Sequence, residues 1–346
     1  IYAYDARGNL ADVTDALGNA THYDYDVNGN LTATTDARGR QTGYAYDAYG
    51  NLWAVVDPLS NRTEFTYDLA GNATGIKDAK GNATSLTYDA MNRVTRILYP
   101  DTTGVSYAYD QVGNRVSMTD GKGNVTQYSY DSLNRLSKVL DPLANTTNYT
   151  YDTEGNRVRT TDANRNQTTY NYNALNRLIE VINPLGHKKS YQYDPAGNRT
   201  RLTDANGNVI NYAYDANNRL MEIVYPDTSK VSFAYDANGN RISMTDSIGI
   251  TEYTYDELNR LVSVDGPETN DVITYAYDAN GNRTSMTDQD GGVTSYEYDA
   301  LNRMVKLTDP KGEITTYSYD GQSNLTKMVY PNKTQTNYAF DNLNRL

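Results

Sequence analysis

The sequence predicts an all-β fold made of tandem 21-residue β-hairpin repeats joined into one continuous antiparallel ribbon. A Tyr-Asp pair recurs with a period of 21 residues, and each period contains two turn-forming segments separated by stretches rich in Thr, Tyr, Val and Ile. A fixed period in this range indicates supersecondary units that bury their faces against their neighbours. We therefore expect a single array over residues 1–346, a segment of a larger protein, whose function belongs to the array. The tyrosines of the pattern are Tyr4, Tyr25, Tyr46, Tyr67, Tyr88, Tyr109, Tyr130, Tyr151, Tyr172, Tyr193, Tyr214, Tyr235, Tyr255, Tyr277, Tyr298 and Tyr319, with Phe340 closing the series.

Each repeat begins with a turn of the form Tyr-Asp-x-x-Gly-Asn, which we call the Tyr-Asp turn. A short stretch with an apolar residue at position 10 follows, and then a second turn of the form Asp-(Ala/Pro)-x-Gly-Asn. Gly and Asn tolerate positive φ, and Asp and Asn form Asx turns. Two turns in each repeat imply two strands, and the spacing predicts strands of five or six residues.

The strand that leads into each Tyr-Asp turn carries a ladder of tyrosines. Thr126, Tyr128 and Tyr130 are spaced by two residues, so they point to one face of the strand. Most of the 34 tyrosines fall at these two ladder positions; the others are Tyr49 and the Tyr-Pro turn residues Tyr99, Tyr225 and Tyr330. All three phenylalanines, Phe65, Phe233 and Phe340, also occupy ladder positions. Exchange of Tyr for Phe indicates that the rings stack and cover their neighbours, not that the phenol performs chemistry.

Two unit types alternate from Tyr88 onward, which makes the larger period 42 residues. Asn92-Arg93 is followed by Gly113-Asn114-Arg115, then by Asn134-Arg135, and the arginine shifts by one place each time. Because a shift of one residue in a strand changes the face, neighbouring hairpins should present arginine differently. The first four units do not alternate.

The spacing between successive Tyr-Asp pairs falls to 20 after Tyr235 and rises to 22 after Tyr255, which places both changes in second turns.

Composition limits the function classes. Mean hydropathy is -0.75 and aromatic residues make up 11%, so a thick aliphatic core is not expected. A net charge of -12 without a basic patch argues against nucleic-acid binding and against anionic membrane surfaces. The absence of cysteine excludes disulfides and thiolate chemistry, and no apolar run approaches the roughly 20 residues of a membrane span.

No catalytic, cofactor-binding or metal-binding residues are predicted. His22 and His187 occupy different repeat positions without a nucleophile at a fixed offset, so neither a triad nor a metal cluster is supported. Loops such as Asp204–Asn208 and Asp236–Asn240 offer oxygen ligands at alternate places, yet they lack the later glycine and glutamate of an EF-hand. Asx turns account for these aspartates.

The repeat motifs resemble those of the RHS/YD-repeat family over the whole chain. Tyr277–Arg283 reads Tyr-Asp-Ala-Asn-Gly-Asn-Arg, and Tyr130–Leu136 reads Tyr-Asp-Ser-Leu-Asn-Arg-Leu. The family includes bacterial RHS proteins, the cocoon-forming components of insecticidal toxin complexes, and teneurins. The resemblance implies hairpins joined into a ribbon that spirals into a hollow shell, secreted or at the cell surface. It further implies a non-catalytic scaffold that encloses a C-terminal toxin or cargo domain or joins further repeats of the same polypeptide.

Four sites look superficially like the Asp-Pro self-cleavage segment of toxin-carrying members. Each one falls at a second turn, where proline presets φ, so we interpret them as turns. They are Asp57-Pro58, Asp141-Pro142, Asn183-Pro184 and Asp309-Pro310.

Other interpretations remain open at this point. An extracellular fibre or adhesin, or a module that binds glycans or surface proteins through exposed aromatic hairpins, would also suit short aromatic repeats. An enzyme would need a polar cluster that is not repeated. For the fold, a propeller of 42-residue blades and a β-solenoid of 21-residue coils are alternatives, although both need more aliphatic positions.

Overall fold

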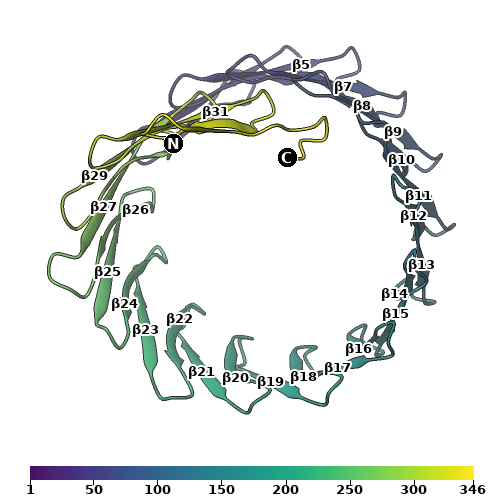
Figure 1. Cartoon of the computed structure of the whole chain (residues 1–346). Coiled ribbons are helices and arrows are strands. Elements are labelled where there is room, and N and C mark those ends of the chain that lie inside the picture. The colour runs from purple at the N-terminus through teal and green to yellow at the C-terminus, as the bar shows by residue number, and fades with distance from the viewer. The chain divides into compact units, whose positions relative to one another are not determined.

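The computed structural model describes residues 1–346 and contains 33 β-strands in one antiparallel sheet, with no helix (Figure 1). The strands after Tyr-Asp turns have five residues each: β2 (Leu10–Thr14), β4 (Leu31–Thr35), β6 (Leu52–Val56), β8 (Ala73–Lys77), β10 (Val94–Leu98), β12 (Arg115–Thr119), β14 (Leu136–Leu140), β16 (Arg157–Thr161), β18 (Leu178–Ile182), β20 (Arg199–Thr203), β22 (Leu220–Val224), β24 (Arg241–Thr245), β26 (Leu261–Asp265), β28 (Arg283–Thr287), β30 (Met304–Thr308) and β32 (Leu325–Val329). The strands after second turns have six residues each: β3 (Ala20–Tyr25), β5 (Gln41–Tyr46), β7 (Arg62–Tyr67), β9 (Ala83–Tyr88), β11 (Gly104–Tyr109), β13 (Val125–Tyr130), β15 (Thr146–Tyr151), β17 (Gln167–Tyr172), β19 (Lys188–Tyr193), β21 (Val209–Tyr214), β23 (Lys230–Tyr235), β25 (Ile250–Tyr255), β27 (Val272–Tyr277), β29 (Val293–Tyr298) and β31 (Ile314–Tyr319). The terminal strands β1 (Tyr2–Tyr4) and β33 (Gln335–Asn337) are shorter.

Consecutive strands pair, as in the run from β12 through β17, so the prediction of tandem antiparallel hairpins is confirmed. Continuous pairing excludes separate four-stranded propeller blades, and antiparallel pairing excludes the parallel coils of a β-solenoid. Strand lengths of five and six residues also match the prediction.

Apart from the second turns at Asp246 and Gly266, both turns of each repeat use the same backbone conformation. In the first Tyr-Asp turn the Gly8 amide donates to the Asp5 carbonyl at 3.1 Å and the Asp5 amide donates to the Asn9 carbonyl at 2.8 Å. Gly8 has a φ of 87°. This is a type I turn closed by a left-handed residue, which explains the glycine or asparagine at that place. The second turn after Asp246 closes on Gly249, one residue early, and the Gly266–Asp271 turn is longer, so the predicted location of the spacing changes is confirmed.

The sheet has no thick core. Only Ala33 and Ala54 are buried hydrophobic residues, and no large side chain is fully buried. The main packing unit is a cross-strand pair between a ladder tyrosine and the apolar residue at position 10, such as Tyr128 opposite Val139. The fold therefore rests on rings that are shielded by neighbouring hairpins.

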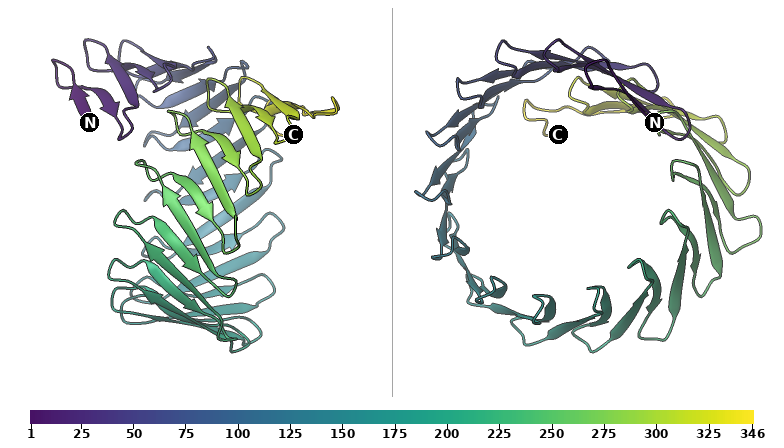
Figure 2. Two further views of the ribbon diagram at one scale, coloured as in Figure 1. Left: turned by 90° about the vertical axis from the view of Figure 1, so that its left-hand side faces the viewer. Right: turned by 180° about the vertical axis from the view of Figure 1, so that it is seen from behind.

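The chain divides into two compact units. The end unit combines Ile1–Gly104 with Glu252–Leu346, and the middle unit is Val105–Thr251. Figure 2 shows the strands of both segments of the end unit, which is coloured purple to blue and light green to yellow. No helix is long and apolar enough to cross a membrane.

Candidate functional surface: tyrosine ladder and turn edges

The second ladder tyrosine uses its hydroxyl as well as its ring. Tyr151 donates to the carbonyl of Leu136 at 2.8 Å, and Tyr193 donates to that of Leu178 at 2.7 Å. This hydrogen bond joins the last residue of one strand to the first residue of the strand before it, fifteen residues earlier in the chain. The Phe exchanges therefore indicate ring packing correctly, but at the second position phenylalanine, as in Phe340, lacks this hydrogen bond. Burial raises the pKa of several of these phenols, including Tyr277 and Tyr319.

The two kinds of arginine contact different rings of the ladder. The arginine that ends a turn lies over the second ladder ring of the next repeat, as Arg135 does over Tyr151 at 4.6 Å. The arginine that begins a strand lies between first ladder rings, as Arg115 does 5.6 Å from Tyr107 and 4.8 Å from Tyr128. Neighbouring hairpins therefore present arginine differently, as predicted. However, both arginines contact ladder rings, so the one-residue shift selects the ring and not the face. Arg115 is the first residue of β12, whereas Arg135 lies in the turn before β14.

Aspartate organises every Tyr-Asp turn except the one that begins with Asn173. Asp194 accepts hydrogen bonds from the Asn198 amide at 2.8 Å and from the Asn198 side chain at 2.9 Å. The side-chain hydrogen bond from Asn198 is the main cause that lowers the pKa of Asp194. In alternate turns arginine replaces this asparagine, and Arg219 Nε lies 2.7 Å from Asp215 Oδ2. The turn is therefore held by an ionised carboxylate.

Neighbouring Tyr-Asp turns are linked to one another. Asn114 Nδ2 donates to Asn134 Oδ1 at 2.9 Å, and Asn156 donates to Asn176 at 2.9 Å. The intervening step is made by arginine, because Arg135 Nη1 donates to the Asp152 carbonyl at 3.0 Å. Asparagine and arginine links alternate along this edge, which gives the 42-residue period a structural reason.

One Tyr-Asp turn of the middle unit departs from the pattern. Asn173 stands where the other repeats have aspartate, and it accepts backbone hydrogen bonds from Leu175 and Arg177 at 3.0 Å. Its amide offers no second carboxylate oxygen, and Arg177 Nε is buried without a hydrogen-bond partner. This turn shows what the carboxylate contributes in the others.

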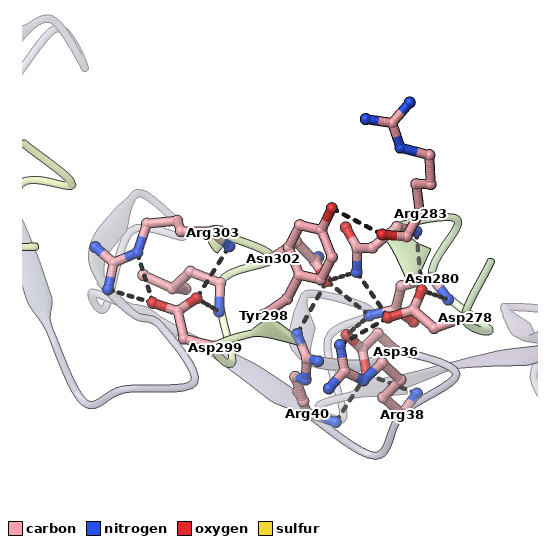
Figure 3. Close-up of polar contacts among 12 residues, drawn as sticks. Asp36, Arg38, Arg40, Asp278, Asn280, Arg283, Tyr298, Asp299, Asn302 and Arg303 are labelled. Atoms are coloured by element: carbon pink, nitrogen blue, oxygen red, sulfur yellow. Dashed lines mark hydrogen bonds and ion pairs between the residues drawn. The ribbon is translucent and has the colours of Figure 1, made fainter. Parts of the chain in front are cut away.

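In the end unit, Tyr-Asp turns of the C-terminal segment lie against second turns of the N-terminal segment, and we call this contact the seam (Figure 3). Arg38 Nη1 is 2.8 Å from Asp278 Oδ2, and the two residues are 240 apart in the chain. Asn280 donates to Asp36, and Arg40 donates to Asn302 Oδ1 at 2.9 Å. The seam therefore joins one kind of turn to the other by charged and amide groups.

Two further contacts continue the seam. Lys80 Nζ is 3.1 Å from Asp320 Oδ2, again 240 residues apart, and Arg345 Nη2 is 3.3 Å from Asp101 Oδ2, 244 residues apart. Burial would raise the pKa of Asp278, but hydrogen bonds from Asn282 and Asn280, together with the charge of Arg38, lower it below its ordinary value. The seam carboxylates are thus ionised and paired.

Sequence patterns did not predict these seam residues. Asp36, Arg38, Asp278 and Asn280 look like ordinary turn residues. A partial signal is present, because second turns carry a cation two residues after aspartate at Arg38, Lys80 and Lys122, with a spacing of 42 residues. This spacing equals the 42-residue period with which the two types of Tyr-Asp turn alternate on the opposite side of the seam.

The histidines and turn aspartates that were considered as candidate site residues lie at ordinary positions of the repeat. His22 is in β3, with Nδ1 2.8 Å from Asp12 Oδ1 and Nε2 3.2 Å from Asp24 Oδ1, and the Asp12 hydrogen bond is the main cause that raises its pKa. His187 ends an exposed second turn. Both carboxylate oxygens of Asp236 accept hydrogen bonds from Asn240, as in an Asx turn. No group of three or more His, Asp or Glu side chains is arranged to hold a metal ion.

The Asp-Pro and Asn-Pro sites are turns, as predicted. Each Asp or Asn carbonyl accepts the amide of the residue three places on. The amides are those of Ser60, Ala144, Gly186 and Gly312.

These features define a tandem β-hairpin repeat array with a structural, tyrosine-lined sheet. The RHS Repeat family model matches residues 4–41, 151–188, 172–209, 193–230, 214–251, 235–271, 277–314 and 305–335, and the Teneurin YD-shell model matches residues 35–162. The chain belongs to the RHS-repeat family. No curated protein sequence matches it significantly.

Solved toxin-complex structures have a similar fold. The crystal structure of TcdB2-TccC3-TEV is 18% identical with a TM-score of 0.63, covering 99% of this chain and 22% of that chain. The crystal structure of TcdB2-TccC3 is 17% identical with a TM-score of 0.62, covering 99% and 24%. The Photorhabdus luminescens Tc holotoxin pore is 18% identical with a TM-score of 0.53, covering 95% and 24%. The chain thus spans about a quarter of the length of the chains it matches.

Proposed function

We propose that this chain is a non-catalytic wall segment of a large secreted or cell-surface RHS-repeat protein, forming one part of a hollow shell around a C-terminal toxin or cargo domain. The observation that carries the proposal is the turn-to-turn seam. It joins repeats 240 residues apart through Arg38–Asp278 and Lys80–Asp320. A ribbon that contacts its own earlier repeats edge to edge can enclose a space.

The composition of the sheet supports a wall. A single sheet between two aqueous spaces needs no fully buried large side chain, and this sheet has none. Ladder rings, arginines and turn carboxylates form repeated contacts that hold one hairpin on the next. The aspartates form hydrogen bonds within the turns. The absence of a catalytic role and of a cofactor stays a prediction.

Two measurements test the proposal. Small-angle scattering of the purified chain should give the profile of a curved wall; a compact disc with a narrow axis, or a solid rod, would contradict it. In the complete polypeptide, limited proteolysis followed by mass spectrometry should cut the repeats before the enclosed domain. Early digestion of a C-terminal domain while the repeats stay intact would exclude encapsulation.

One observation favours binding of carbohydrate as a second candidate. A cavity of about 550 Å³ is lined by the exposed Tyr49 and by Tyr67, together with Asp47 and Asn51. Aromatic faces beside carboxylate and amide groups suit sugar rings. A glycan array of the chain and of a Tyr49→Ala variant tests it: signal that depends on Tyr49 supports the candidate, and no signal with the native chain rejects it.

A further inference from the structure

The Tyr-Asp turns at the seam are of two types that differ in charge. In the asparagine type, which ends in Asn, Asp320 Oδ2 accepts a hydrogen bond from the neutral Asn324 side chain at 3.0 Å. In the arginine type, which ends in Arg, Asp299 Oδ2 accepts from Arg303 Nε at 2.7 Å, so the turn neutralises its own carboxylate (Figure 3). Only the asparagine type therefore offers an uncompensated negative charge to the seam.

The second turns on the other side of the seam alternate as well. Their third residue is a cation in every other turn, and an apolar or acidic residue in the turns between. In chain order these residues are Leu17, Arg38, Leu59, Lys80 and Asp101.

The cationic second turns meet Tyr-Asp turns of the asparagine type. Arg38 Nη1 is 2.8 Å from Asp278 Oδ2, and Lys80 Nζ is 3.1 Å from Asp320 Oδ2. In both contacts the cation reaches a carboxylate whose partner within its own turn is a neutral asparagine. The seam thus places its cations where the opposite row leaves negative charge unpaired.

The arginine-type turns reverse the direction of the charge contact. Arg345 Nη2 is 3.3 Å from Asp101 Oδ2, so here the Tyr-Asp turn supplies the cation and the second turn supplies the acid. The pKa of Asp15 is lowered mainly by the hydrogen bond from the Asn19 side chain, and the charge of Arg260 lowers it further. Both ends of the seam therefore follow the same complementarity.

We infer that this alternation sets the register of the seam, because a cationic second turn selects a Tyr-Asp turn of the asparagine type. A slip of one repeat would place Lys80 against Asp299 or Asp341, which already lie 2.7 Å and 2.6 Å from their own arginines. In one direction it would also bring Asp101 to Asp320, two like charges. The 42-residue period of the sequence is therefore the period of the contact. This inference rests on the seam, as the proposed function does, but not on what the shell encloses.

Because the chain has no cysteine, one engineered pair of thiols can report the register. A Cβ atom at Gly321 would lie 3.5 Å from the Cβ of Ala79 and 2.9 Å from the end of the Asn61 side chain, which can move aside. The Cβ atoms of a disulfide are about 3.5–4.5 Å apart. Ala79→Cys with Gly321→Cys therefore reports the native register, and Ala79→Cys with Ala300→Cys reports a slip of one repeat. Titration with glutathione, which gives the effective concentration of each thiol pair, should favour the 79–321 pair by about tenfold or more.

Charge variants in the 79–321 background test the selection itself. Lys80→Glu removes the cation, and Asn324→Arg converts the turn to the arginine type, so each alone should lower the effective concentration about tenfold. The two together should restore it, because an acid and an arginine then face each other as Asp101 and Arg345 do. Lys122→Glu, at the equivalent place in a second turn of the middle unit, is the matched control and should leave the value unchanged.

The outcomes separate this inference from the proposed function. A 79–321 pair that forms no disulfide in the native background would remove the seam, and the proposed wall and the register rule with it. A disulfide that forms equally well at 79–300, single charge variants that behave like the native background, or a double variant no better than the single ones would overturn the register rule alone. Circular dichroism of each variant checks that the sheet is intact.

Discussion

The Tyr-Asp turns at 131–135 and 299–303 have the same pattern, Asp-x-Leu-Asn-Arg, but lie in different surroundings. In the middle unit the Arg135–Asp131 pair is 2.7 Å long and both side chains are 26% exposed. In the end unit the Arg303–Asp299 pair is 2.6 Å long with exposures of 15% and 14%. The difference is the seam, which places second turns of the N-terminal segment over the C-terminal turns.

This comparison separates two levels of organisation. The hairpin and its turn are built from contacts within one repeat and its neighbour, and they are the same in both units. The seam adds charged contacts between turns that are distant in sequence, with the same residue types. Changes to the seam carboxylates therefore affect both the turn and the seam. Changes to the second-turn residues that lie over them affect the seam contact.

Acid should have the largest effect, because it protonates the carboxylate of nearly every turn. The folded pKa values of Asp278, Asp299 and Asp320 lie below the ordinary value, so the stability they contribute is complete above about pH 4 and is lost as pH falls through those lowered values. Urea unfolding at stepwise lower pH measures this loss. Equal stability at pH 6 and pH 3 would contradict it.

The turns that begin with Asn173 and Asn183 are internal controls for the acid effect. Their amides do not titrate, so hydrogen exchange in these two turns, corrected for the intrinsic rate, should change least as pH falls. The turns of the seam should change most, since Arg38 and Lys80 lose their acceptors as well.

Asp278→Ala should be more damaging than Asp194→Ala. Both variants lose the two hydrogen bonds from the asparagine four residues on, but only Asp278 also accepts from Arg38. We expect Asp278→Ala to cost about 2–4 kcal/mol, because part-buried donors lose a charged acceptor. Hydrogen exchange at residues 36–40 should rise in Asp278→Ala and stay unchanged in Asp194→Ala. A rise in both would mean that the seam is not specific to this contact.

The sequence predicts the repeat well, for reasons that are local. Turn chemistry at positions such as Gly8, the alternation of Tyr128 and Tyr130, and the confinement of spacing changes to the Asp246 and Gly266 turns are all encoded within one period. The period was also sufficient to identify the family, because the motif occurs so many times.

The seam could not be predicted in the same way. In a 21-residue repeat the second turns share one pattern, and so do the Tyr-Asp turns, so the repeat alone does not say which of them meet. The cations spaced by 42 residues at Arg38, Lys80 and Lys122 mark candidate turns but not their partners. Arg38 and Asp278 gain their meaning only from the fold. The hydrogen bond of the Tyr151 hydroxyl was missed for a different reason, since its acceptor is a backbone carbonyl without a side-chain signal.

Asn173→Asp should stabilise the Tyr-Asp turn at residues 173–177. The carboxylate would give the buried Arg177 Nε the acceptor that Arg135 Nε has at 2.7 Å in Asp131. We expect a gain of about 1 kcal/mol, seen as a higher urea midpoint. Asn183→Asp is the matched control, because His187 and not arginine lies four residues later, and it should gain less. An equal gain in both variants would show that general turn chemistry, not the arginine contact, is responsible.

The smallest effect tests the ladder itself. The hydroxyl of Tyr319 donates to the Met304 carbonyl at 2.8 Å, whereas that of Tyr298 donates to the Arg283 carbonyl at 3.0 Å. Tyr319→Phe should cost about 1 kcal/mol or slightly less, since it leaves the carbonyl without this donor. Tyr298→Phe should cost less than that, because its longer bond is replaced more readily by water. Tyr317→Phe, in the ring-packing position, should leave urea stability unchanged, because phenylalanine already occupies the same ladder position at Phe233. A cost at Tyr317 as large as that at Tyr319 would mean that the two ladder positions are equivalent after all, and that the hydroxyl contacts do not distinguish them.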